Sequence, residues 1–82
     1  MDLTKHGFVV RETTEEGSGE MRLEVRTADK DNFVAWFRTM IRTHDGDEKT
    51  EISVEYVRRK DMSRTQDIAV RAWLREQMEA LI

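Results

Sequence analysis

Two neighbouring segments near the start of the chain, 7–12 and 20–26, have the residue pattern of strands. Apolar and polar residues alternate strictly in 20–26, and 7–12 places Phe8 and Val10 on one face and Val9 and Arg11 on the other. A period of two is typical of strands that bury one face. In the second segment three apolar side chains fall on the same side: Met21, Leu23 and Val25. The segment 13–19 between them contains two glycines and no apolar residue, which is turn composition. The pattern predicts a β-hairpin.

From Asp29 the spacing of apolar residues changes to that of a helix, ending near residue 44. The positions concerned are Phe33, Trp36, Phe37, Met40, Ile41 and His44. Thr27 or Asp29 would be the N-cap of this helix, and Asp45-Gly46 would end it. The sequence therefore predicts a helix over about 29–44.

A third alternating segment, 50–58, predicts another strand, with Ile52, Val54 and Tyr56 inward. The clearest start signal follows at Ser63, because serine there and glutamine at position 66 match the capping box of a helix. The core stripe expected for this C-terminal helix is Val70, Trp73, Leu74, Gln77, Met78 and Leu81.

The 82 residues leave room for one domain, 1–82, with a single core. The element order predicts an α+β fold of the type ββαβα. We expect a three-stranded antiparallel sheet in the order 2-1-3, with both helices packed on one face. Pairing of the third strand beside the second strand is the alternative order.

Composition restricts the classes of function. The chain has no cysteine, which excludes disulfides, thiol chemistry and cysteine-ligated metals. No apolar run is long enough to span a membrane, and the start of the chain has no secretory signal pattern. We therefore expect a cytoplasmic protein that has no membrane partner and needs no cofactor.

Candidate catalytic chemistry is sparse, so we expect no enzyme and no catalytic residues. His6 and His44 are the only histidines, and neither has a partner that suggests a nucleophile or a metal set. The acidic segment that begins at Asp45 looks like part of a calcium loop, but Lys49 occupies a position that needs an oxygen ligand. We expect no metal site.

Acidic residues gather in two loops that the expected topology places at one end of the fold. They are Glu12, Glu15, Glu16, Glu20, Asp45, Asp47, Glu48 and Glu51, with Lys49 as the single base among them. The whole chain carries a net charge of only −3, so this end should be much more acidic than the rest. Such a cluster either keeps the loops soluble or attracts a basic surface on a partner protein.

Basic residues form a second group before and along the C-terminal helix: Arg58, Arg59, Lys60, Arg64, Arg71 and Arg75. A basic helix face is able to follow a phosphate backbone. Pairing of Asp67 with Arg71 at i,i+4 spacing is the simpler interpretation of part of this face.

The leading hypothesis is a small non-enzymatic protein-interaction domain, acting as an inhibitor that docks its acidic end onto a basic, nucleic-acid-handling surface. Small phage anti-defence proteins, including anti-CRISPR proteins, share this general profile of size and charge, although no motif connects them to this chain. The alternative is a nucleic-acid-binding regulator that uses the basic helix face. A third possibility is a structural subunit that forms homo-oligomers through a sheet edge or through Leu81-Ile82.

Overall fold

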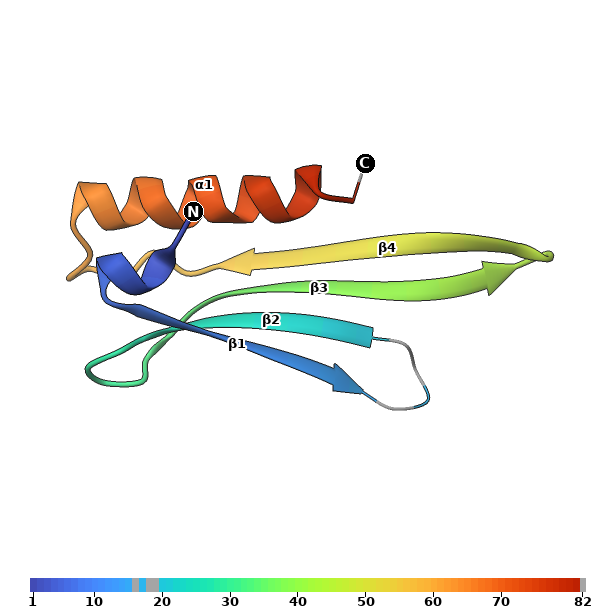
Figure 1. Cartoon of the computed structure of the whole chain (residues 1–82), viewed down its shortest axis with the longest axis horizontal. Coiled ribbons are helices and arrows are strands. Elements are labelled where there is room, and N and C mark those ends of the chain that lie inside the picture. The colour runs from blue at the N-terminus through green and yellow to red at the C-terminus, as the bar shows by residue number, and fades with distance from the viewer. Residues whose placement is uncertain (16, 18–19, 82) are drawn as a thin grey trace.

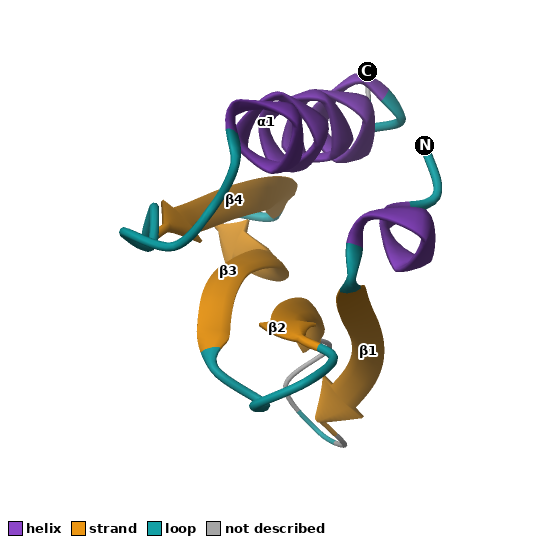
Figure 2. Ribbon diagram, turned by 90° about the vertical axis from the view of Figure 1, so that its left-hand side faces the viewer, coloured by secondary structure: helices purple, strands orange, loops and turns teal. Residues whose placement is uncertain are grey.

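The computed structural model describes residues 1–15, 17 and 20–81, apart from the side chain of Glu15. The elements in chain order are η1 (Leu3–His6), β1 (Phe8–Glu15), β2 (Glu20–Thr27), β3 (Phe33–His44), β4 (Asp47–Tyr56) and α1 (Arg64–Glu79). All three neighbouring strand pairs are antiparallel, and they form one sheet in the order β1-β2-β3-β4. The short helix η1 and the long helix α1 lie over one side of this sheet (Figures 1 and 2).

The first hairpin and the last helix form where the sequence predicts them. β1 pairs with β2 so that Val10 lies opposite Val25. The capping box at the start of α1 is complete: the Ser63 hydroxyl oxygen accepts the Gln66 N–H at 3.1 Å, and the Gln66 side chain accepts the Ser63 N–H at 3.0 Å. Local signals are sufficient for these elements.

The helix expected over 29–44 is wrong, because the structure has strand β3 there. The ββαβα fold with a three-stranded sheet and two packed helices is therefore replaced by four strands and one long helix, within the same α+β class. The strand order 2-1-3 is also wrong, since the last strand pairs with β3 and not with β1 or β2. His44 ends a strand and caps no helix.

The turn that ends β3 explains this difference. Asp45 and Gly46 both have positive φ, 51° and 84°, and they connect His44 directly to Asp47. Two positive φ values in a two-residue loop make a type I′ turn, whose backbone twist suits a β-hairpin. The Asp-Gly pair thus joins two strands, although it was interpreted as the end of a helix.

Thr27 also has a role different from helix capping. Its side-chain oxygen accepts the N–H of Asn32 at 2.9 Å, and its own N–H donates to the Asn32 carbonyl at 2.9 Å. Asp31, inside this loop, has a positive φ of 55°. These bonds close a turn between β2 and β3, so neither Thr27 nor Asp29 is an N-cap.

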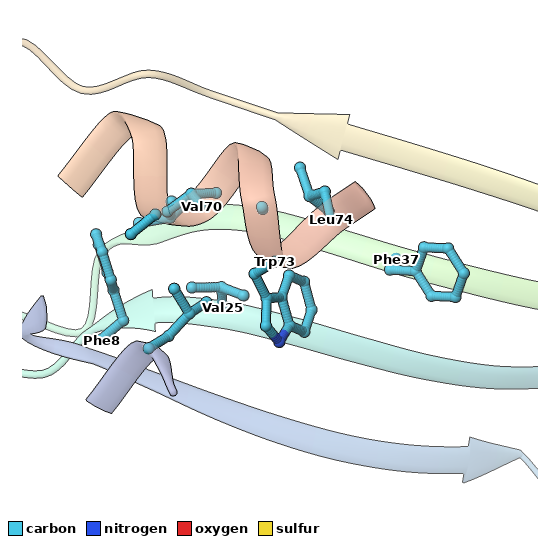
Figure 3. Close-up of a cluster of buried hydrophobic side chains, with 10 residues drawn as sticks. Phe8, Val25, Phe37, Val70, Trp73 and Leu74 are labelled. Carbon is cyan, nitrogen blue, oxygen red and sulfur yellow. The ribbon is translucent and has the colours of Figure 1, made fainter. Parts of the chain in front are cut away.

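The core lies between α1, η1 and the adjacent half of the sheet (Figure 3). It consists of Leu3, Phe8, Val25, Val34, Ala35, Phe37, Ala69, Val70, Trp73 and Leu74. A β-bulge shifts the register between β2 and β3, because Val25 faces Ala35 while Arg26 faces Phe33. The extra residue is Val34, which lets two consecutive side chains of β3 be buried.

The expected stripe of α1 is correct at Val70, Trp73 and Leu74, which are buried, while Gln77 is half-buried. Met78 and Leu81 are exposed, so the core ends before the helix does. Ile82 lies outside the described residues.

Candidate protein-interaction surface

The β3–β4 hairpin runs on past the C-terminal end of α1 and makes the molecule 46 Å long (Figure 1). Near α1 the helix-facing side of the sheet is core, as at Phe37. On the same side, Val54 lies beside Phe37 on the edge strand, and Ile52 and Ile41 lie farther toward the tip. The exposed fractions of Ile41, Ile52 and Val54 are 55%, 43% and 39%. The hairpin therefore exposes to solvent apolar side chains of the kind that form the core near α1.

The pairing register puts these three side chains on one surface. Phe37 lies opposite Val54, Thr39 opposite Ile52, and Ile41 opposite Thr50. Directly opposed residues in an antiparallel pair point to the same face, and alternate residues of a strand share a face. We call the surface of Ile41, Ile52 and Val54 the hairpin face. Ile52 and Val54 were expected to be inward, and they do face the helix side, but α1 does not bury them.

The tip of the hairpin holds the second acidic segment of the sequence. Asp45, Asp47 and Glu48 lie there, and all three are exposed. Glu51 lies farther along β4 and forms an ion pair with Arg42, at 2.7 Å between the Glu51 Oε2 and the Arg42 Nε. We use the name acidic tip for Asp45, Asp47 and Glu48.

The first acidic segment is distributed differently. Glu20 is only 7% exposed, and its Oε1 lies 3.0 Å from the Arg22 Nη2 and 3.7 Å from the Arg38 Nε. Glu12 is exposed opposite Leu23. Glu16 and the side chain of Glu15 lie outside the part of the chain that the structure describes. The end of β1 and the start of β2 lie toward the same end of the molecule as the acidic tip, which projects farther (Figure 1).

The other side of the sheet carries alternating acids and arginines. The Arg26 Nε contacts Glu24, the Trp36 indole N–H donates to Glu55 Oε2 at 3.0 Å, and Arg38 lies 5.0 Å from the Trp36 ring centre. Arg38 and Arg42 are the residues that sequence analysis missed here, because a helical assignment separates them from the strand carboxylates. The positive charges of Arg38 and Arg42 reduce the acidity expected at the end of the molecule that carries the two acidic segments.

Half of the basic group is paired with carboxylates within the fold. Arg58 and Arg71 lie 3.9 Å and 3.0 Å from oxygens of Asp67, which confirms the expected Asp67–Arg71 pair. Arg59 lies 3.9 Å from Asp61. The other members, Lys60, Arg64 and Arg75, are exposed. Half of the expected phosphate-binding face is thus already used in intramolecular pairs.

Tyr56 completes the network around Asp67. Its hydroxyl donates to Asp67 Oδ1 at 2.7 Å, and the Arg71 guanidinium lies 5.6 Å from the ring centre. Burial, followed by the hydrogen bond to Asp67, raises the pKa of Tyr56 to about 12. The same hydrogen bond, with that of Arg71, holds the pKa of Asp67 below its usual value. The network joins the end of β4 to the first turns of α1.

Tyr56 is the chain's single tyrosine, so its ionisation is directly visible in the ultraviolet absorbance. We expect a titration midpoint near pH 12 in the folded protein, against about 10 for a free phenol. Asp67→Asn should lower the midpoint part of the way, because burial remains. Since the folded pKa is raised, the associated stabilisation is complete below pH 10 and is lost between pH 10 and 12. Tyr56→Phe should lack this loss, and a wild-type midpoint near pH 10 would contradict the network.

The described part of the chain holds no group of three histidine, aspartate or glutamate side chains placed to bind a metal ion. Among the described residues, no helix has both the length and the apolar character required to cross a membrane. A cavity of about 310 Å³ lies between the β2–β3 turn and the start of α1, where Asp29 and Asp61 are its ionisable lining residues. Comparisons with protein-family models, with curated proteins and with solved structures find no match for this chain.

Proposed function

We propose that this protein is a non-enzymatic protein-interaction domain that docks its projecting β3–β4 hairpin onto a basic surface of a partner protein. The observation that carries this proposal is the exposure of the hairpin face, on a hairpin that continues past the end of α1 (Figure 1). Contiguous exposed apolar side chains with a polar border are typical of protein interfaces. Here the border is the acidic tip, which favours a partner of opposite charge.

The proposed mode of action is inhibition by competition. Basic protein surfaces commonly bind nucleic acid through its phosphates. A hairpin that places carboxylates on such a surface and packs apolar side chains beside them excludes the nucleic acid from it. The basic residues near α1 give the nucleic-acid-binding alternative less support, because Arg58 and Arg71 are paired with Asp67.

Two hairpin variants test this proposal. The immobilised protein captures its partner from cell lysate with and without nuclease treatment, and the captured partner is then purified for affinity measurements. Ile41→Asn removes an apolar contact, and the double variant Asp47→Lys/Glu48→Lys reverses the acidic tip. We expect each to weaken partner binding about ten-fold or more, since interface cores are largely apolar and charge reversal produces repulsion. Higher salt should slow association of the parent protein with its partner.

Ile68→Asn is the matched control, because Ile68 lies on α1 and has the same exposed fraction as Ile41, 55%. It should bind like the parent protein. A partner that binds all of these variants equally well would contradict docking through the hairpin. Capture that disappears on nuclease treatment would instead favour binding of nucleic acid, which Arg64→Glu would then weaken.

A further inference from the structure

The outer edge of β4 is a ten-residue row of backbone groups at the border of the sheet. In a two-residue hairpin the closing pair, His44 and Asp47, is hydrogen-bonded. Alternate residues then follow the same pattern, so odd-numbered residues of β4 bond to β3. The bond from the Val57 N–H to the Val34 carbonyl, 2.8 Å long, agrees with this parity. The backbone N–H and C=O groups therefore point away from β3 at Thr50, Ile52 and Val54. Such outward groups on an edge strand are able to pair with a further strand.

We propose that a second copy of this chain pairs with that edge, antiparallel and two-fold symmetric, with Ile52 opposite Ile52 of the second copy. This inference goes beyond the proposed function, because it uses the edge of the same hairpin and its partner is a second copy of the chain. A two-fold axis perpendicular to the sheet keeps equivalent faces together. Such an axis therefore pairs odd-numbered residues only with odd-numbered residues and even-numbered residues only with even-numbered ones. Few registers remain to be compared.

Charge selects among these registers. With Ile52 on the axis, Lys49 lies opposite Glu55 of the second copy, and symmetry repeats this pair. If the second strand is shifted by two residues toward the tip, Glu51 lies opposite Glu51 of the second copy. The opposite shift places Glu51 opposite Glu55 of the second copy. A shift of four residues toward the tip leaves Val54 opposite the turn. Only the register centred on Ile52 combines full strand overlap with opposite charges.

The same register brings the two charged segments of the chain together. Asp47 lies opposite Val57 of the second copy, so the acidic tip of each chain lies alongside Arg58 and the basic residues after it. The two hairpin faces also join into one apolar strip on the helix side. The uneven charge along a single chain is thus complementary to itself.

Charge-swap variants test the register by sedimentation over a wide range of protein concentration. Lys49→Glu or Glu55→Lys alone should raise the dimer dissociation constant about ten-fold, because each places like charges at two symmetric positions. The double swap Lys49→Glu/Glu55→Lys should restore dimerisation, since it exchanges the paired charges. Lys5→Glu, an exposed change on η1, is the control for net charge and should leave dimerisation unchanged.

A proline variant tests the edge itself. Thr50→Pro removes an N–H that points away from β3, so the circular dichroism spectrum should persist while the dimer is lost. A parent protein that stays monomeric at every concentration, or a double swap as weak as the single variants, would overturn the edge pairing. In either case, loss of partner binding in Ile41→Asn would still support the proposed function, because Ile41 lies on β3, away from this edge.

Discussion

Trp73→Ala is expected to destabilise the fold by about 3–5 kcal/mol, because it leaves a large cavity between α1 and the sheet. The side chain is 5% exposed and lies in the centre of the core (Figure 3). A chain of 82 residues has a total stability of roughly 4–12 kcal/mol, so this one change removes much of it. Chemical denaturation followed by circular dichroism measures the loss.

Ile68→Ala is the matched control on the same helix, five positions earlier and 55% exposed. Exposed apolar residues contribute little to the free energy of unfolding, so its effect should stay within about 0.5 kcal/mol. Equal effects of the two substitutions would mean that α1 packs on the sheet through a different face. The buried face was predictable from the sequence, since the capping box fixes the start of the helix and the apolar spacing fixes the stripe.

The segment 33–44 shows where sequence patterns were insufficient. Its first five residues are all apolar, and a continuous apolar run fits a buried helix or a buried strand equally well. The bulge at Val34 further disturbs the alternation that would identify a strand. The clearest local signal for a strand was Asp45-Gly46, which favours a hairpin turn between alternating segments. The apolar spacing was interpreted as helical, and that pair was then interpreted as the end of the helix.

Prediction of the candidate surface depended on the same choice between helix and strand for the segment 33–44. The acidic loop residues were identifiable from the sequence, and the hairpin tip does contain Asp45, Asp47 and Glu48. Their surroundings were not, because Arg42 contacts Glu51 only when β3 and β4 pair as neighbouring strands. The exposure of Ile41 also depends on how far α1 reaches over the sheet. Strand pairing and helix coverage are long-range properties, so local periodicity does not determine them.

The last prediction compares two residues on the same side of β3, one beneath α1 and one beyond it. Phe37 is 1% exposed and Ile41 is 55% exposed, although both face the helix side of the sheet. Phe37→Ala should therefore destabilise the protein by about 3–5 kcal/mol, whereas Ile41→Ala should change the free energy of unfolding by at most about 0.5 kcal/mol. Denaturant unfolding of both variants, with equal denaturant dependence, gives the comparison.

Ile41 is the informative member of this pair. If its replacement by alanine leaves stability unchanged but weakens partner binding, an apolar residue is present on the hairpin for a reason other than folding. A loss of several kcal/mol at Ile41 would instead show that the hairpin face is buried in the folded protein in solution. Measuring this loss at low and high protein concentration separates burial within one chain from burial between two copies, because only the second depends on concentration.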